Sequence, residues 1–311
     1  MNTNNIVYIL LILLFFKKSF KEGGYAVSDN IRSELFFLKQ YGFNNTLLQH
    51  IFLLGIDPIQ AIFNDKYKTH DELEKKFTDI EKRLAASFNS YQNFKINLFE
   101  NEDLLKKGSG NKIYFKYDVN EVTKLIPDKI MPLFMYSKGD FTLLDDNKKR
   151  VAIVGTRHPS KKSVTITEKI TKKFVEDNYV IVSGLAEGID TISHETAILN
   201  KGKTIAILPT NFKNIYPKRN EALAKVILDE GLLLTSIGPK ENTYKSSFLE
   251  RNQYVANISD IVVVIETNFK SGTMNTIRNA SEANKKILFV DQKDKLINDK
   301  IYEFGGEMLN D

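Results

Sequence analysis

The chain has 311 residues, and its hydrophobic content of 42% is enough to form one large domain and a smaller one. It carries 44 Lys and Arg residues against 39 Asp and Glu residues, and this small positive excess permits a polyanionic partner without requiring one. The absence of cysteine excludes a disulfide framework, a thiolate zinc site and a cysteine nucleophile, and it is typical of a protein in a reducing cytoplasm.

An apolar run from Ile6 to Phe16 is the first predicted element, and Lys17 and Lys18 follow it. The run is too short to cross a bilayer, because a spanning helix needs about 20 apolar residues. A secretory signal would place basic residues before the run, where this chain has Asn2 to Asn5. We therefore expect a soluble, cytoplasmic protein without an integral membrane span. The run is predicted to form a buried first helix, and the alternatives are a peripheral membrane contact, a partner contact or a signal peptide.

Residues 1–100 are predicted to form a smaller helical N-terminal domain, because their apolar residues recur at helical spacing. Within this domain, the charged stretch from Asp71 to Ser87 is predicted to be one amphipathic helix with a solvated charged face. Its apolar residues recur at intervals of three or four: Leu73, Phe77, Ile80 and Leu84. Residues 101–150 are mixed in composition, and Pro127 and Pro132 break any long helix there. We interpret them as a connector that leads into the main domain.

The pattern changes over residues 151–311, where short β-branched runs alternate with stretches of helical length. This alternation predicts an α/β fold, a Rossmann-like and doubly wound domain with a mostly parallel sheet. The six predicted strands are Val151 to Val154, Val180 to Val182, Thr204 to Leu208, Leu232 to Ser236, Ile261 to Ile265 and Ile287 to Val290. In such sheets ligands bind beyond the carboxyl ends of the strands, where turns lead into helix N-termini that favour anions. The residues directly after the strands are therefore the candidates for function.

Two glycine-containing turns follow the first two predicted strands. They contribute the candidate phosphate-binding residues Gly155, Thr156, Arg157, Ser183 and Gly184. Both turns can present backbone N–H groups to a phosphate, and a guanidinium such as that of Arg157 can hold one bidentately. Neither turn matches a Walker loop or the complete dinucleotide fingerprint. Glycines that only permit tight turns, and an ordinary surface arginine, are the alternative interpretation.

Three further segments place cations and small polar side chains near the same predicted edge. They contribute the candidate phosphate-binding residues Lys218, Asn220, Arg251, Asn252, Ser271, Gly272 and Thr273. Ser271 and Thr273 also suit plain helix N-caps, so this alternative stays open. Tyr216 and Phe248 are candidates for stacking on a base, as aromatic side chains do in proteins that bind single strands. An aromatic residue of such a fold is more often part of the core.

Asp190 and His194 stand one turn apart on a predicted helix, where they could act as an acid–base couple. No nucleophile or metal-ligand set accompanies them, so we expect a structural hydrogen bond between the two, with Asp190 capping or orienting the turn. We expect no catalytic residue, no metal site, no cofactor and no enzymatic activity. The predicted mechanism is binding without chemistry.

The order and spacing of these segments resemble the DprA/Smf DNA-processing family over roughly residues 133–290. The matching segments are Val154 to Arg157, Ser183 to Asp190 with His194 and Ala197, Tyr216-Pro217 with Asn220, Arg251-Asn252, and Ser271 to Thr273 with Thr276, Ala280 and Glu282. The resemblance implies a Rossmann-like domain that binds single-stranded DNA in a basic pocket, commonly as a homodimer. It also implies a role in loading the RecA recombinase during uptake of transforming DNA.

The chain departs from the pattern of this family at three places. Pro209 and Asn211 stand where the family has two glycines, and Gln253 and Glu250 replace a cation and add a carboxylate beside Arg251. The chain after Val290 is short and lacks the usual glycine-rich loop. These departures predict a divergent or reduced member with a weaker phosphate site, in which Arg157 carries more of the binding.

The alternative function is that of a nucleotide-derivative sensor or enzyme, because the wider superfamily that includes the LOG phosphoribohydrolases uses the same strand-end pocket. Those hydrolases have a glutamate in their Gly-Gly-x-Gly-Thr-x-x-Glu loop, whereas Thr276 follows Gly272-Thr273 here at the corresponding position. This difference disfavours hydrolysis and leaves a non-catalytic nucleotide sensor, or a purely structural partner protein, as the alternatives.

Overall fold

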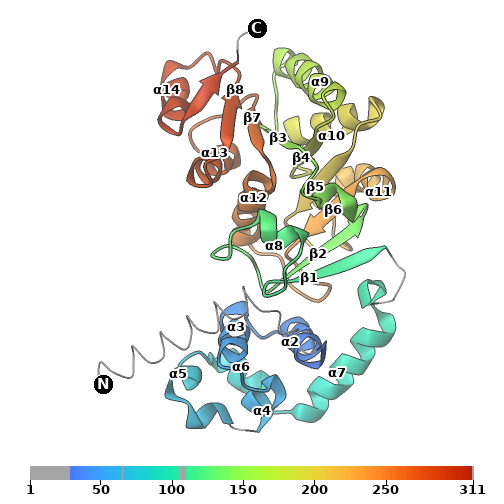
Figure 1. The fold of residues 1–311 in the computed structure, drawn as a ribbon, viewed down its shortest axis with the longest axis vertical. Coiled ribbons are helices and arrows are strands. Elements are labelled where there is room, and N and C mark those ends of the chain that lie inside the picture. Colours follow the sequence, from blue (N-terminus) through green and yellow to red (C-terminus); the bar gives the residue numbers. More distant parts are fainter. Residues whose placement is uncertain (1–28, 65, 106–109, 310–311) are drawn as a thin grey trace. The chain divides into compact units, whose positions relative to one another are not determined.

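The structure is a computed structural model that describes residues 29–64, 66–105 and 110–309, and the chain forms two compact units that divide after Asp103 (Figure 1). The apolar run Ile6 to Phe16 lies outside the described residues. Within the described ranges, no helix is both long and apolar enough to cross a membrane.

The first unit is helical, as predicted. Its helices are α2 (Asp29–Tyr41), α3 (Asn45–Leu53), α4 (Pro58–Phe63), η1 (Lys66–Thr69), α5 (Asp71–Glu74), α6 (Asp79–Leu84) and α7 (Phe88–Asn101), and η2 (Asp103–Leu105) follows at the boundary. Leucine side chains from α2 and α3, including Leu35, Leu38 and Leu47, are fully buried in its core. Tyr91 of α7 is also buried, and its ring stacks on Phe63 with centroids 5.1 Å apart. The apolar stripes of short helices thus meet in one small core.

The single helix predicted from Asp71 to Ser87 is wrong, because α5 and α6 are separate helices. Thr78 is the N-cap of α6, and its hydroxyl accepts a hydrogen bond from the Glu81 amide, while the Glu81 carboxylate accepts one from the Thr78 amide. This capping box starts a new helix in place of continuing the old one. Ile80, which the single helix would place on the packing face, is 67% exposed. The Glu81 carboxylate is buried, and it also accepts a hydrogen bond from the Asn44 amide.

The second unit is built on one nine-stranded sheet. Its strands are β1 (Asn111–Phe115), β2 (Phe134–Gly139), β3 (Arg150–Val154), β4 (Val180–Ser183), β5 (Thr204–Leu208), β6 (Leu232–Thr235), β7 (Ile261–Val264), β8 (Lys286–Phe289) and β9 (Gly306–Met308). The strand order is β1-β2-β6-β5-β4-β3-β7-β8-β9, with parallel pairing from β6 to β9 and antiparallel pairing at β1 and β2. The Rossmann-like, mostly parallel sheet is therefore confirmed, and all six predicted strands are present.

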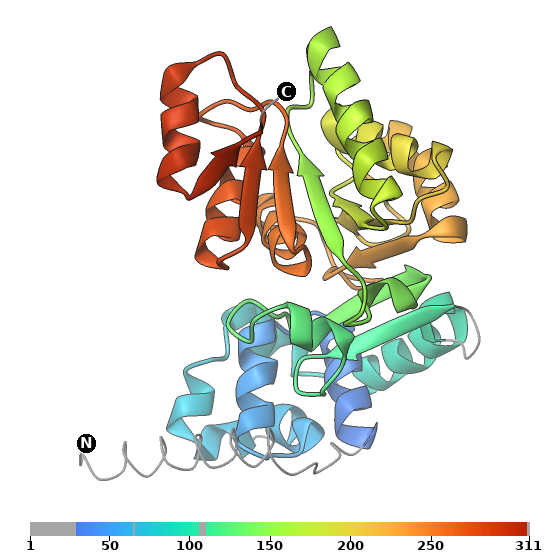
Figure 2. The same cartoon turned by 45° about the horizontal axis from the view of Figure 1, so that its top comes forward.

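Helices cover both faces of this sheet, as expected for strands that are apolar on both sides. They are α8 (Glu121–Leu125), α9 (Lys161–Glu176), α10 (Ile189–Leu199), α11 (Glu221–Glu230), α12 (Lys245–Ile258), α13 (Gly272–Glu282) and α14 (Lys295–Glu303), with the short turns η3 (Phe141–Leu144) and η4 (Lys218–Asn220). Along β3, Ala152 and Val154 pack with α12 and α13, whereas Val151 and Ile153 pack with α9 and α10 on the other face (Figure 2). This alternation is the period of two that a strand imposes.

The connector predicted at residues 101–150 is wrong, because β1, α8 and β2 lie there and extend the sheet through β6. The two strands combine buried aromatic residues such as Tyr114 and Tyr136 with polar residues such as Lys112 and Lys138. They therefore lack the continuous β-branched run that marks the central parallel strands. The short strand β9 at the other edge is likewise not among the six predicted strands.

The order of the strands creates a switch point at β3. From β3 the chain proceeds to β4, β5 and β6 on one side, and then crosses back to β7, β8 and β9 on the other side. In doubly wound sheets a crevice for ligands lies beyond the carboxyl ends of the strands at this kind of reversal. The topology therefore points to the loops that follow β3, β4 and β7.

Candidate functional site

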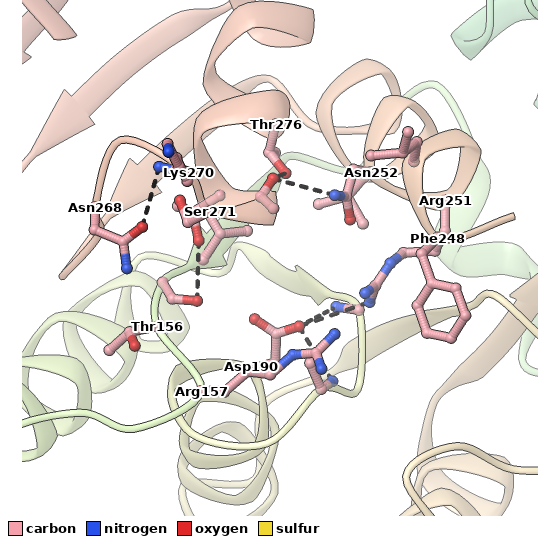
Figure 3. A pocket seen from close by; sticks show the side chains of 18 of the residues that line it. Thr156, Arg157, Asp190, Phe248, Arg251, Asn252, Asn268, Lys270, Ser271 and Thr276 are labelled. Atoms are coloured by element: carbon pink, nitrogen blue, oxygen red, sulfur yellow. Dashed lines mark hydrogen bonds and ion pairs between the residues drawn. The ribbon is translucent and has the colours of Figure 1, made fainter. Parts of the chain in front are cut away.

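A cavity of about 340 Å³ opens beside the carboxyl ends of β3, β4 and β7, and Figure 3 shows its lining side chains. Nine of the predicted phosphate-binding residues line it: Gly155, Thr156, Arg157, Gly184, Arg251, Asn252, Ser271, Gly272 and Thr273. A smaller cavity of about 120 Å³ adjoins it and shares Arg157, Gly184 and Arg251. The residues singled out from separate turns in the sequence thus meet at one place.

Close packing between two loops positions Arg157 at the mouth of the cavity. Gly188 has φ +77°, and a Cβ atom on it would lie 2.4 Å from the Thr156 carbonyl oxygen, so the loop after β4 can approach the loop after β3 only with glycine there. The Ile189 amide donates to the same carbonyl at 3.2 Å, and the Thr156 amide donates to the Glu266 carbonyl at 2.7 Å. These contacts fix the backbone of the β3–α9 loop and leave the Arg157 side chain exposed.

Arg251 of α12 lies in the wall of the cavity with its guanidinium almost completely buried. The residue is 6% exposed, and a Cβ atom on Gly184 would lie 1.3 Å from its Nη1 atom, so only glycine at 184 leaves room for this side chain. Among the described residues, Nε and Nη1 of Arg251 have no hydrogen-bond acceptor, and the Asp190 carboxylate lies 3.7 Å from Nη1. Burial lowers the pKa of Arg251, Asp190 opposes this shift and Arg157 adds to it.

Asp190 is the buried counter-ion of Arg251 and also organises the loop after β4. Its Oδ2 atom accepts hydrogen bonds from the Gly184 and Ala186 amides, each at 3.2 Å. Burial raises the pKa of this carboxyl, while the charge of Arg251 and these amides act in the opposite direction. The predicted role of Asp190 in orienting the turn agrees with this geometry.

The predicted hydrogen bond between Asp190 and His194 is wrong. Asp190 stands in the first turn of α10, where its carboxylate reaches the free amides of the preceding loop. His194 lies one turn further, fully buried against the sheet, and its Nδ1 atom is 2.7 Å from the Thr204 hydroxyl. Burial, followed by the charge of Arg251, lowers the pKa of His194 to about 3.

The wall opposite Arg157 is the start of α13. Ser271 is the N-cap of this helix, and its hydroxyl accepts a hydrogen bond from the Met274 amide. Ser271 therefore has the capping role that the sequence allowed as an alternative to phosphate binding. The Thr273 hydroxyl donates to the Gly155 carbonyl at 3.0 Å, and the Asn252 amide group donates to the Gly272 carbonyl at 3.1 Å. The backbone N–H groups of Gly272 and Thr273 belong to the first turn and have no partner within the helix. They are the donors that this wall can offer to an anion.

Three predicted site residues lie outside both cavities. Ser183 is buried and donates to the Ile153 carbonyl at 2.8 Å. Asn220 is also buried and donates to the Leu185 carbonyl at 2.9 Å, which supports the loop after β4. The side chain of Lys218 is 86% exposed and pairs with Glu221 at 2.7 Å.

Other residues also line the larger cavity, including His158, Lys270, Thr276 and Asn268. His158 and Lys270 belong to strand-end segments that the sequence points to, and Thr276 belongs to a segment that matches the DprA/Smf family. No pattern in the sequence identifies Asn268. The rings of Tyr216 and Phe248 line the smaller cavity and contact each other edge to face, with centroids 5.4 Å apart. Neither lies fully in the core.

Known proteins resemble the chain over the unit that holds this site. The family model of DNA recombination-mediator protein A matches residues 116–301. The DNA processing protein DprA of Bacillus subtilis is 36% identical over 159 residues, which are 51% of this chain and 53% of that protein. The corresponding protein of Streptococcus pneumoniae is 38% identical over 159 residues, 51% of this chain and 55% of that protein. The chain thus spans about half the length of these curated relatives.

Two solved structures are similar over most of their length. The X-ray structure of DNA processing protein A from Streptococcus pneumoniae matches with a TM-score of 0.61 and 26% identity, covering 89% of this chain and 94% of that one. A structure of the Helicobacter pylori protein, described for its unique single-stranded DNA binding mode, matches with a TM-score of 0.57 and 28% identity, covering 66% of this chain and 94% of that one.

Proposed function

The chain belongs to the DNA recombination-mediator protein A family, known as DprA/Smf, and on this premise we propose that it binds single-stranded DNA in the cavity beside β3, β4 and β7. The reported binding mode of the Helicobacter pylori relative supports this ligand. The proposed role is that of a binding protein, and no residue is assigned to a catalytic step.

The buried guanidinium of Arg251 is the observation that carries the proposal. A buried polar group without an acceptor is unfavourable, by roughly 1–3 kcal/mol for each unmet hydrogen bond and more for a charged group. Nε and Nη1 of Arg251 are in this state, and Asp190 at 3.7 Å is too distant for a hydrogen bond. Because Arg251 lines the cavity, a phosphate bound there would lie beside this guanidinium and would accept a hydrogen bond from it.

The remaining roles follow from position. Arg157, exposed at the mouth, neutralises a second phosphate, and the amides of Gly272 and Thr273 bind an anionic oxygen at the start of α13. Tyr216 and Phe248 provide an aromatic surface for a base in the adjoining cavity. In this proposal Ser183 and Asn220 do not contact the DNA but hold the strand end and the loop after β4 through hydrogen bonds. Lys218, which pairs with Glu221, contributes only long-range charge.

The wider proposal is that of a cytoplasmic homodimer that protects single-stranded DNA and loads the RecA recombinase in transformation or recombination. It rests on the family and on the strand-end motifs. The alternative is a sensor of a free nucleotide derivative, because a cavity of about 340 Å³ is within the usual range for small ligands.

Fluorescence anisotropy of labelled oligo-dT, measured from low to high salt, tests the proposal. We expect the logarithm of affinity to fall linearly with the logarithm of salt, by about 0.7 for each phosphate contact on a single strand. Arg157→Ala should reduce this slope by about 0.7, and Arg251→Gln should lower affinity at least about tenfold, because each removes a charged partner of phosphate. Lys286→Gln is the matched control, since Lys286 pairs with Glu307 at the opposite ends of the strands.

Binding that does not respond to salt, or no binding at low salt, would contradict the proposal. Saturable binding of thymidine monophosphate by calorimetry, together with no oligonucleotide binding, would favour the nucleotide sensor instead.

A further inference from the structure

The two rims of the cavity differ in how their cations are paired. On the rim beside η4, Lys218 pairs with Glu221, and Arg219 pairs with Glu187, which itself lines the smaller cavity. These carboxylates neutralise the cations and repel phosphate. A strand that leaves the cavity over this rim would meet little net positive charge.

The rim formed by the β7–α13 loop is different. Lys270 lines the larger cavity and is exposed, and among the described residues no carboxylate lies within ion-pair distance of it. Its neighbour Phe269 is 49% exposed, although it is large and apolar. Figure 3 shows Lys270 on the side of the cavity away from Phe248 and Arg251. An exposed ring beside an unpaired cation is the combination that single-strand binders use for one base and one phosphate.

The start of α9 continues this rim. The Glu266 carboxylate, at the end of β7, accepts from the Ser160 amide at 3.0 Å, so the N-terminus of α9 is tied to the loop that carries Lys270. Lys161 follows Ser160 directly, is exposed, and has no carboxylate within ion-pair distance in the described part of the chain. The pKa of the Asp291 carboxyl is lowered mainly by hydrogen bonds from Asn298 and the Lys293 amide, and also by the charge of Lys162, the next residue. The positive charge of Lys162 is therefore partly balanced by Asp291.

We propose that a single strand bound in the cavity leaves it across the β7–α13 loop, with a base stacked on Phe269 and the next phosphates beside Lys270 and Lys161. This exit path rests on the proposed function and adds a direction to it. The η4 rim is not part of the path.

The chain contains no tryptophan, so Phe269→Trp creates a single fluorescent reporter on the path. We expect saturating dT20 to quench the emission of this variant, because the indole ring stacks on a base. Leu199→Trp is the matched control, since Leu199 is 81% exposed at the end of α10, beside the opposite ends of the strands. The emission of the control should not change. Anisotropy of labelled dT20 reports binding independently for both variants.

The cations of the path are tested by the double variant Lys161→Gln/Lys270→Gln. We expect its salt slope for dT20 to fall by about 1.4, which corresponds to two phosphate contacts. The double variant Lys286→Gln/Lys300→Gln removes two cations that pair with Glu307 and Glu303, and it should leave this slope unchanged.

The outcomes separate this inference from the proposed function. If Phe269→Trp binds dT20 by anisotropy without quenching, or if the salt slope of Lys161→Gln/Lys270→Gln is unchanged, the exit path is overturned and the cavity remains the binding site. Loss of all oligonucleotide binding by the unmodified protein overturns both.

Discussion

Two buried ionisable residues of α10 respond to the same surroundings in different ways. Asp190 keeps a cation and two backbone amides as partners, so its charge has a role in the site. The Nδ1 atom of His194 is within hydrogen-bond distance of the Thr204 hydroxyl, and its Nε2 atom has no hydrogen-bond partner among the described residues. A neutral imidazole tolerates this environment, but an imidazolium does not.

The buried His194 predicts a stability that depends on pH. Its pKa of about 3 in the folded protein lies below the value of 6.5 for an unperturbed histidine, so protonation favours the unfolded chain. The contribution of neutral His194 to the free energy of unfolding is fully present above about pH 6.5 and declines as the pH falls toward 3. Between pH 7.5 and pH 5 the free energy of unfolding should fall by about 2 kcal/mol from this residue alone. Urea unfolding at several pH values measures it.

His194→Gln provides the comparison, because an amide can bond to Thr204 and does not titrate. Its free energy of unfolding should depend less on pH than that of the parent, by the same amount of about 2 kcal/mol over this range. Equal dependence in the two proteins would show that His194 is not the residue responsible.

At the level of single residues, the sequence identifies the side chains of the site better than their roles. Arg157 and Arg251 are predicted site residues because they adjoin predicted strands or match a family segment, and both line the cavity. Lys218 is predicted by the same reasoning but pairs with Glu221. Sequence order cannot reveal this difference, because the partner of an exposed cation is set by the rotamers and loop path of the folded chain.

At the scale of elements, the loops after β3 and β4 act as one unit. Gly188 permits their contact through a positive φ and through the absence of a Cβ atom, and these two contributions can be separated. Gly305 has a similar φ of +81°, but a Cβ atom on it would meet no heavy atom within 4 Å. It therefore serves as a control for backbone strain without a steric clash.

We expect Gly305→Ala to lower the free energy of unfolding by about 1 kcal/mol, the usual order of cost for a non-glycine residue in left-handed backbone. Gly188→Ala should lower the free energy of unfolding by about 1–3 kcal/mol more than Gly305→Ala does, because its Cβ atom also clashes. It should weaken oligo-dT binding as well, because the β3–α9 loop that holds Arg157 must move. Chemical denaturation and anisotropy measure the two effects. A Gly188→Ala protein with the stability of Gly305→Ala and parental affinity would contradict the proposed contact.

The elements that the sequence predicts well are those with a strong local signal. The central strands are continuous β-branched runs, and their limits agree with the structure within one or two residues. The strands β1, β2 and β9 have no such run; β1 pairs with β2, β2 pairs with β6, and β9 pairs with β8. In the helical unit, the break before α6 depends on a cap that the hydrophobic period does not report.

At the scale of the whole molecule, each of the two compact units has a hydrophobic core of its own among the described residues. One core lies among α2, α3 and α7, and the other lies on both faces of the sheet. A ligand that binds only the second unit should stabilise only that unit. With oligo-dT at about 100 times its dissociation constant, the expected gain is about 2.7 kcal/mol, which raises the unfolding temperature of this unit by roughly 5–10 °C.

Differential scanning calorimetry with and without oligo-dT measures this shift. At the same oligo-dT concentration, the tenfold weaker binding expected of Arg251→Gln should reduce the gain to about 1.4 kcal/mol, roughly half, without removing the transition of the helical unit. An equal shift of both transitions would show that the two cores unfold together.

The edges of the sheet have a consequence for self-association. An open edge exposes unpaired N–H and C=O groups that can recruit strands from other molecules. Here β9 offers only three residues, and β1 offers five, among which Lys112 stands charged and paired with Glu121. A short or charged edge resists strand addition. The short edge at β9 and the charged edge at β1 therefore disfavour extension of the nine-stranded sheet by strands of other chains.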